Sequence, residues 1–179
     1  MDSDVQPGKP NIEIREAGKG DCALLANLIR DSFKEVAERF DLTRENAPTH
    51  PYFCTEDWVE SALDKGVRFF IMVINGSPCG CVGVEKGGDR KFFMERLAVL
   101  PECRGLGFGE ALVQHALTVA KKAGARDLLI GVISGELKLL DWYRGLGFVE
   151  VGRKHFEHLP FQVVFMSHKL SASRKLADN

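Results

Sequence analysis

The sequence lacks the features that would make it a membrane protein or a nucleic-acid-binding protein. None of its apolar runs approaches the length needed to span a bilayer. Runs of lysine or arginine are absent, and the 179-residue chain has a formal net charge of −1. It therefore has no general basic field for nucleic acid or anionic lipid, and we expect neither partner.

Cysteine is scarce and lacks the spacing of a metal site. Of the five cysteines, only Cys79 and Cys81 lie close together. Residues 1–10 are polar and contain no apolar signal core. We therefore expect reduced, mostly buried thiols in a cytoplasmic protein. His155 and His158 are too few for a metal motif, so no metal is predicted.

Hydrophobic periodicity predicts one domain of mixed α/β structure. We expect this domain over residues 11–170, a frayed N-terminal tail over 1–10 and a polar C-terminal tail over 171–179. Asp21 and Thr55 are expected to cap the first two helices, and Asn75 and Gly76 to form a hairpin turn. The predicted strands are 11–17, 68–74, 79–85, 90–100, 127–132, 148–152 and 161–169, and the predicted later helices are 107–122 and 134–144. Strands and helices alternate along the chain only in its second half, which excludes a regular doubly wound Rossmann sheet.

A glycine-rich turn follows the fourth predicted strand. Gly105, Gly107 and Gly109 stand at every second position before a helix. The unpaired N–H groups at a helix start, together with the macrodipole, form an anion site suited to phosphate. The turn lacks the last glycine of a dinucleotide fingerprint and the lysine of a P-loop. A nucleotide-binding protein is therefore disfavoured.

The pattern that this turn does satisfy is Arg/Gln-x-x-Gly-x-Gly, formed by Arg104, Gly107 and Gly109. A second motif, Tyr-x-x-x-Gly-Phe, begins at Tyr143, one helix–strand–helix unit later. In both motifs the sequence resembles the GNAT (GCN5-related N-acetyltransferase) family over roughly residues 12–170. The resemblance implies a mixed α/β (α+β) fold. Its central, mostly antiparallel seven-stranded sheet would splay after the fourth strand and carry helices on both faces.

The resemblance also implies acetyl-CoA as co-substrate and direct acetyl transfer to an amine. The main chain of Leu97, Ala98 and Val99 would pair with the pantetheine arm. The pyrophosphate would lie on the next loop, which consists of Arg104, Gly105, Leu106, Gly107, Phe108, Gly109 and Glu110. The guanidinium of Arg104 would add charge there.

Two residues are candidates for proton transfer. Tyr143 is the candidate acid for the CoA thiolate, because a phenol has a higher pKa than a thiol. It also matches a cofactor-binding position of the family. The alternative is that Tyr143 is a buried packing aromatic. Glu95 is the candidate base, because strict alternation places it on the face of Phe93, Leu97 and Val99, where burial would raise its pKa. An ordered water is the alternative base, and the adjacent Arg96 also permits a surface role for Glu95.

The acceptor is less well defined by the sequence. Glu136 stands where the family often has a cofactor-contacting asparagine, so that role does not carry over. The resemblance places the acceptor near loops 41–54 and 153–161, which carry aromatics and histidines such as His50 and His155. This mix favours a small polar amine or amino acid. Alternatives are a non-catalytic acyl-CoA sensor or partner module and a peptide amine acetyltransferase, and the sequence leaves a homodimer open.

Overall fold

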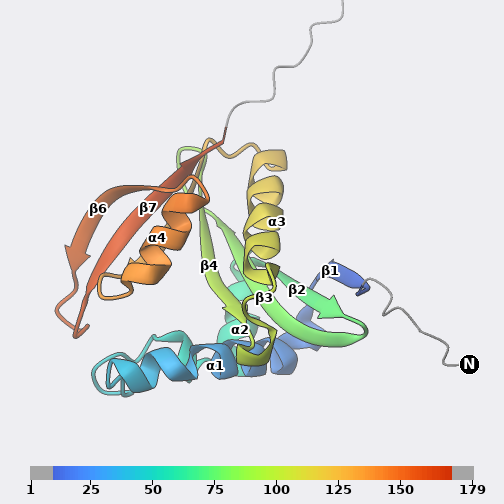
Figure 1. Ribbon diagram of the computed structural model, residues 1–179, viewed down its shortest axis with the longest axis horizontal. Coiled ribbons are helices and arrows are strands. Elements are labelled where there is room, and N and C mark those ends of the chain that lie inside the picture. Colours follow the sequence, from blue (N-terminus) through green and yellow to red (C-terminus); the bar gives the residue numbers. More distant parts are fainter. Residues whose placement is uncertain (1–9, 171–179) are drawn as a thin grey trace, which may run out of the picture.

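A seven-stranded sheet in the order β1-β2-β3-β4-β5-β7-β6 forms the centre of the computed structural model (Figure 1), which describes residues 10–170. The strands are β1 (Ile12–Glu16), β2 (Arg68–Ile74), β3 (Ser77–Lys86), β4 (Lys91–Val99), β5 (Asp127–Ile133), β6 (Val149–His155) and β7 (Gln162–Lys169). The α-helices are α1 (Cys22–Arg39), α2 (Glu56–Asp64), α3 (Phe108–Lys122) and α4 (Leu137–Gly145). The predicted tails lie outside the described residues, except for Pro10.

The sheet is antiparallel except at β4 and β5, which run parallel and separate early. Only Lys91–Phe93 of β4 pair with Asp127–Leu129 of β5. On its other side, β5 pairs with β7 along its whole length, from Asp127 to Ile133. The rest of β4 therefore has an edge without a neighbouring strand. This confirms the mostly antiparallel seven-stranded sheet and its splay after the fourth strand.

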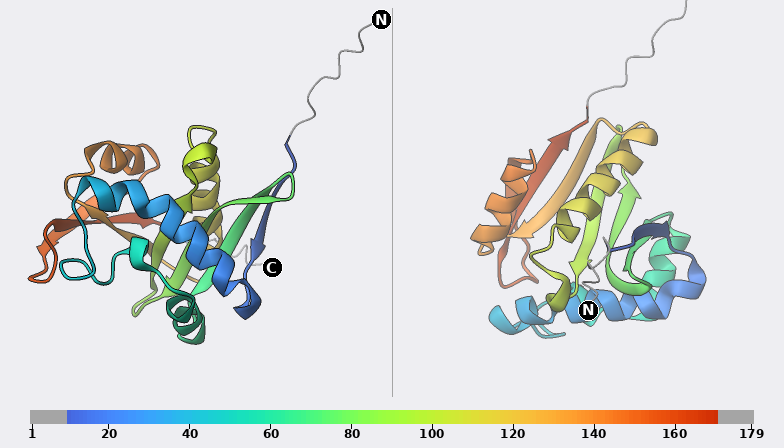
Figure 2. Two further views of the ribbon diagram at one scale, coloured as in Figure 1. Left: turned by 90° about the horizontal axis from the view of Figure 1, so that it is seen from below. Right: turned by 45° about the vertical axis from the view of Figure 1, so that its right-hand side comes forward.

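Helices cover both faces of the sheet (Figure 2). On one face, Leu112 and Ala116 of α3 pack in a core that includes Phe70 of β2. On the other, Leu25 and Ile29 of α1 pack in a second core. The helical spacing of these apolar residues explains why each helix buries one side. The two cores hold β3 and β4 between α1 and α3, and thereby fix the position of the splayed edge.

Local turn chemistry confirms some predictions and corrects others. Asn75 and Gly76 both have positive φ, 50° and 84°, as a tight hairpin requires. The Thr55 hydroxyl accepts the Trp58 N–H at the start of α2. Asp21 stands at the N-cap position of α1, as predicted, but its side chain makes no capping hydrogen bond to that helix. Its carboxylate accepts hydrogen bonds from Arg15 and from the Gly18 N–H rather than capping α1.

Most element boundaries lie within two residues of the predictions, and two differ by three residues. The helix expected from residue 134 begins only at Leu137, because the segment before it forms a turn in which the Glu136 N–H donates to the Ile133 carbonyl. The strand expected to end at residue 152 continues to His155, where β6 still pairs with β7. Periodicity could not show this extension, since every residue of β6 is exposed.

The five cysteines are free, and Cys103 alone among them is not fully buried. Within residues 10–170, no cluster of three or more His, Cys, Asp or Glu side chains could hold a metal ion. Of the helices in this part of the chain, none has the length and apolarity of a membrane span.

Candidate functional site

A cleft of about 490 Å³ lies at the splayed edge of β4. Its walls come from α1, the end of β4, the loop after it and α4. The predicted cofactor residues that line it are Leu97, Ala98, Val99, Arg104, Gly105, Gly107, Phe108, Gly109 and Glu110. Leu106 does not line the cleft, since its side chain is 66% exposed and faces a separate hollow beside Cys79 and Cys103.

One wall of the cleft was not predicted. Ser32, Phe33, Val36 and Arg39 of α1 line it, more than sixty positions before the glycine loop. Their spacing shows only that they share one face of a helix, which is equally typical of a core. Trp142 of α4 also lines the cleft.

The glycine loop has the backbone that an anion site requires. Gly105 and Gly107 have φ values of +76° and +81°, a left-handed conformation that glycine adopts without strain. Gly107 is the N-cap of α3, so the first-turn N–H groups of that helix begin at this loop. Gly109 differs from these two, because its φ is not positive and a Cβ there would make only ordinary contact with the Trp142 ring, at 3.5 Å. The loop can thus present main-chain donors to a phosphate.

Arg104 is bound within the protein rather than directed freely into the cleft. Its Nε donates to the Val99 carbonyl at 3.1 Å and its Nη2 to the Ser32 carbonyl at 2.7 Å. Its Nη1 pairs with Glu35. Arg104 therefore joins α1 to the end of β4, and it occupies the Val99 carbonyl that we expected to remain available to the pantetheine arm.

A bulge in β4 overturns the predicted placement of Glu95. Arg96 has a φ of +51°, and the β3–β4 register shifts between Cys81 and Gly83. Leu97 packs against the core on the α3 face. The Glu95 side chain lies on the opposite face, where it and Phe69 are the nearest contacts of a Cβ built at Gly83. Glu95 and Leu97 do not share a face, since the extra residue of a bulge reverses the alternation.

Glu95 lines a cavity of its own, about 270 Å³ in volume, beneath α2. Trp58, Lys65, Glu85 and Arg96 also line this cavity, and none of its lining residues lines the cleft. Burial raises the pKa of the Glu95 carboxyl, and the Arg96 guanidinium at 3.3 Å partly opposes that shift. The raised pKa agrees with our expectation, but the position outside the cleft does not.

Tyr143 is a deeply buried residue of α4. It is 6% exposed, and its ring packs edge-on against Trp142 and Phe148. Burial alone raises the pKa of its phenol, so the hydroxyl holds its proton firmly. Trp142 lines the cleft, whereas Tyr143 lies in the core behind it. Tyr143 thus occupies the position of a buried packing aromatic, which was our alternative interpretation. Its role as an acid stays a prediction.

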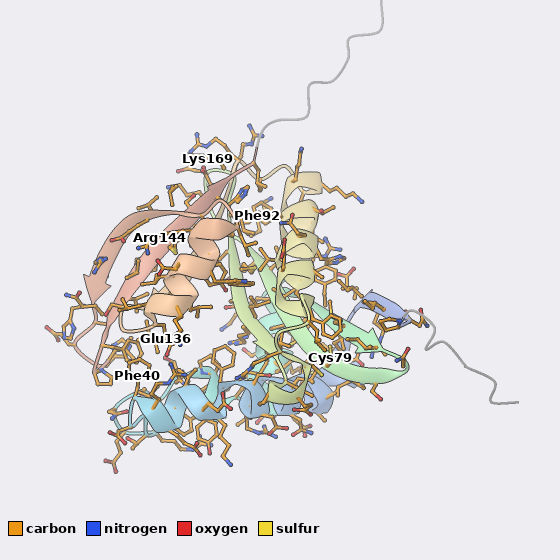
Figure 3. The ribbon with its side chains drawn as sticks, in the orientation of Figure 1. Phe40, Cys79, Phe92, Glu136, Arg144 and Lys169 are labelled. Atoms are coloured by element: carbon orange, nitrogen blue, oxygen red, sulfur yellow. The ribbon has the colours of Figure 1, made fainter. Side chains whose placement is uncertain are left out.

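Glu136 stands at the N-cap of α4 and is bridged to α1. Its Oε1 pairs with Arg39 at 2.6 Å, and its side chain is 11% exposed. Figure 3 shows Glu136 at the start of α4, facing the end of α1 near Phe40. It lines the cleft and also an adjoining cavity. Glu136 therefore marks the boundary between the two spaces.

The adjoining cavity, about 250 Å³, receives parts of both predicted acceptor loops. Thr49, His50 and Pro51 come from the first loop, and Leu159 and Phe161 come from the second. His155 and His158 do not line it. Phe33, Val36, Glu136 and Leu139 line both this cavity and the cleft, so the two spaces are contiguous.

A splayed sheet, a cleft with a glycine loop at a helix start and a second cavity beside that cleft are the features of an acyl-group transferase. The family model described as the acetyltransferase (GNAT) family matches residues 25–148. The chain therefore belongs to the GNAT family of acetyltransferases, and it is an acyltransferase.

Relatives in sequence carry compatible names. A Bos taurus protein named thialysine N-epsilon-acetyltransferase is 27% identical over 145 residues, which cover 76% of this chain and 83% of that protein. An uncharacterized N-acetyltransferase of Schizosaccharomyces pombe is 31% identical over 153 residues, covering 79% of this chain and 88% of that protein.

Solved structures show the same fold. A GNAT-family acetyltransferase of Staphylococcus aureus matches with a TM-score of 0.70 at 20% identity, over 90% of this chain and 100% of that one. A Salmonella typhimurium protein solved with its cofactor acetyl-CoA matches with a TM-score of 0.66 at 18% identity, over 91% of this chain and 96% of that one.

Proposed function

We propose that residues 11–170 form one acetyl-CoA-dependent N-acetyltransferase domain that moves an acetyl group directly to a primary amine of a small molecule or amino acid. The observation that carries this proposal is the cleft at the splayed edge, which brings the end of β4 and the start of α3 together. Membership of the family supports the donor, as does the related fold solved with acetyl-CoA.

The cleft suits an extended donor with a phosphate at one end. The free edge of β4 at Leu97, Ala98 and Val99 can pair with the amide groups of a pantetheine arm as if with another strand, except at the Val99 carbonyl, which already accepts a hydrogen bond from Arg104. Main-chain N–H groups between Arg104 and Glu110 would hold the pyrophosphate. The Glu110 carboxylate itself repels an anion, so its contribution would come from its main chain.

The reaction needs one group that accepts a proton and one that donates a proton. The amine nitrogen forms a bond to the thioester carbon, the carbon–sulfur bond breaks, and the electron pair leaves on sulfur. Tyr143 is our candidate to protonate that thiolate because its phenol carries a proton at neutral pH, although burial raises its pKa and so makes it a weaker donor than an exposed phenol. Glu95, or a water in its place, is our candidate to take the amine proton. Because the bulge places Glu95 on the α2 face, in a cavity that shares no lining residue with the cleft, it would act on an amine in the cleft through water.

A small acceptor is supported by the size of the adjoining cavity, about 250 Å³. It is also supported by the relative named thialysine N-epsilon-acetyltransferase.

The free state of the five cysteines supports a reducing, cytoplasmic compartment.

A thiol-release assay tests the proposal. The full chain is incubated with acetyl-CoA and a panel of amino acids, polyamines, aminoglycosides and peptides. We expect free CoA only when an acceptor is present, and a higher melting temperature with acetyl-CoA than with ATP. Thermal stabilisation by acetyl-CoA without thiol release from any amine would instead identify a non-catalytic sensor.

A further inference from the structure

We propose that the acceptor is a primary monoamine with an apolar body, aromatic or branched aliphatic, whose body fills the cavity beside the cleft and whose amine faces Glu136. This inference rests on the proposed function and narrows its substrate class.

The lining of the cavity is almost entirely apolar. Its members are Phe33, Val36, Thr49, His50, Pro51, Gly131, Val132, Ile133, Glu136, Leu139, Leu159, Phe161 and Val163. Glu136 is the one charged residue of this set. A second ammonium, or the carboxylate of an amino acid, would be desolvated there without a matching charge. The cavity therefore favours a body that carries no further charge.

His50 contributes a neutral ring. Burial lowers the pKa of its imidazole to about 4. Its Nδ1 accepts the Tyr52 N–H, which places the ring proton on Nε2. The ring also packs edge-on against Phe33, with centroids 5.8 Å apart. His50 therefore extends the aromatic wall and does not attract a carboxylate as a cation would.

Glu136 orients the amine toward the cleft. It lines both spaces, so a group bound to it lies at their boundary. Arg39 pairs with its Oε1, and Oε2 takes no part in that pair. An incoming ammonium can therefore approach Oε2 while its apolar body extends away from the cleft, toward Leu159 and Phe161. This orientation directs the nitrogen to the side on which the donor would lie.

Comparison of acceptors tests the inference in the full chain. The measured quantity is kcat/KM from thiol release with acetyl-CoA, for 2-phenylethylamine, 3-methylbutylamine, putrescine and lysine. We expect each apolar monoamine to exceed putrescine and lysine by about tenfold or more. Equal or higher values for putrescine or lysine would overturn the inference and leave the proposed function intact. Absence of thiol release with every amine would count against the proposed function itself.

A matched pair of variants locates the specificity. Val163→Asp places a carboxylate in the cavity wall, whereas Val151→Asp makes the same change on β6 at a residue that is 57% exposed. We expect Val163→Asp to shift the ratio of kcat/KM values from the monoamines toward putrescine by about tenfold, and Val151→Asp to leave the ratio unchanged. The same ratio in both variants would contradict the placement of the acceptor.

A longer acyl donor provides a further check on what fills the cavity. Hexanoyl-CoA is compared with acetyl-CoA, each with the best acceptor. We expect acetyl-CoA to give the higher kcat/KM, because the amine's body occupies the apolar space. A higher value for hexanoyl-CoA would show that the cavity receives the acyl chain, and the inference would be wrong.

Discussion

The guanidinium of Arg104 donates a 2.7 Å hydrogen bond to the main-chain carbonyl of Ser32, and so joins the loop after β4 to α1. A second bond, from Nε to the Val99 carbonyl, ties the same side chain to the end of β4. The two walls of the cleft are therefore connected through one residue. Arg104 can set the width of the cleft even where it makes no contact with a phosphate.

The first prediction concerns this connection. Arg104→Gln should lower the free energy of unfolding by about 1–3 kcal/mol and weaken CoA binding, because charged hydrogen bonds to two carbonyls are lost. Denaturant unfolding and calorimetric titration measure the two effects. Glu35→Gln, which removes only an exposed ion pair, should cost about 1 kcal/mol or less. Unchanged stability with much weaker CoA binding would instead show that Arg104 acts directly on the phosphate.

The second prediction separates backbone strain from ligand binding. Gly107→Ala and Gly66→Ala each place a Cβ on a residue with positive φ, +81° and +92°, with no neighbouring atom within 4 Å. Both should lower stability by about 1–2 kcal/mol. Gly66 follows α2 and does not line the cleft, so only Gly107→Ala should weaken CoA binding, by about tenfold or more. Equal affinities in the two variants would refute the assignment of the pyrophosphate loop.

The third prediction concerns Tyr143. Tyr143→Phe should lower kcat by about a hundredfold and leave KM for acetyl-CoA nearly unchanged, because only the proton donor is removed. The melting temperature should change little, since the ring still packs against Phe148. Full turnover in this variant would mean that the side chain serves packing alone.

The fourth prediction concerns Glu95. Glu95→Gln should lower kcat/KM by about a hundredfold and remove the acidic limb of its pH profile if the carboxylate accepts the amine proton. Because burial raises the pKa of this carboxyl, the limb in the wild type should lie above the pH at which an exposed glutamate titrates. Glu85→Gln, a change in the same cavity, serves as the control and should keep the limb. An unchanged profile in Glu95→Gln would assign the proton to water.

The fifth prediction is a pH dependence of stability. Burial lowers the pKa of His50 from its ordinary value of 6.5 to about 4, so the unfolded chain binds the proton more tightly. The stability that the neutral His50 ring contributes to the folded state is fully present above about pH 6.5, and it is lost as the pH falls toward 4. His50→Gln should remove about 3 kcal/mol of this dependence. Urea unfolding at several pH values measures the free energy of unfolding of the wild type and of His50→Gln. If both lose the same stability as the pH falls, the effect belongs to other groups.

Much of the fold follows from patterns that depend on near neighbours. The hairpin at Asn75 and Gly76, the cap at Thr55 and the glycine loop all reflect local backbone preferences, and the structure has each in place. The two motifs led to the family because their residues share a strict spacing. The order of the elements could therefore be predicted with few errors.

The site was harder to predict, because its features depend on contacts between distant segments. Alternation cannot reveal the bulge at Arg96, so it placed Glu95 on the wrong face of β4. Spacing cannot reveal that Arg104 reaches the Ser32 carbonyl on α1, 72 positions away. The depth of Tyr143 follows from how α4 packs on the sheet. Each of these features appears only when the chain is folded.

The central claim is direct transfer of the acetyl group from acetyl-CoA to an amine, and two-substrate steady-state kinetics tests it most directly. Rates are measured while acetyl-CoA and 2-phenylethylamine are both varied, and the product is identified by mass spectrometry. We predict intersecting double-reciprocal lines, an N-acetylated amine and a protein that stays unmodified with acetyl-CoA alone. Parallel lines together with an acetylated protein would contradict the account.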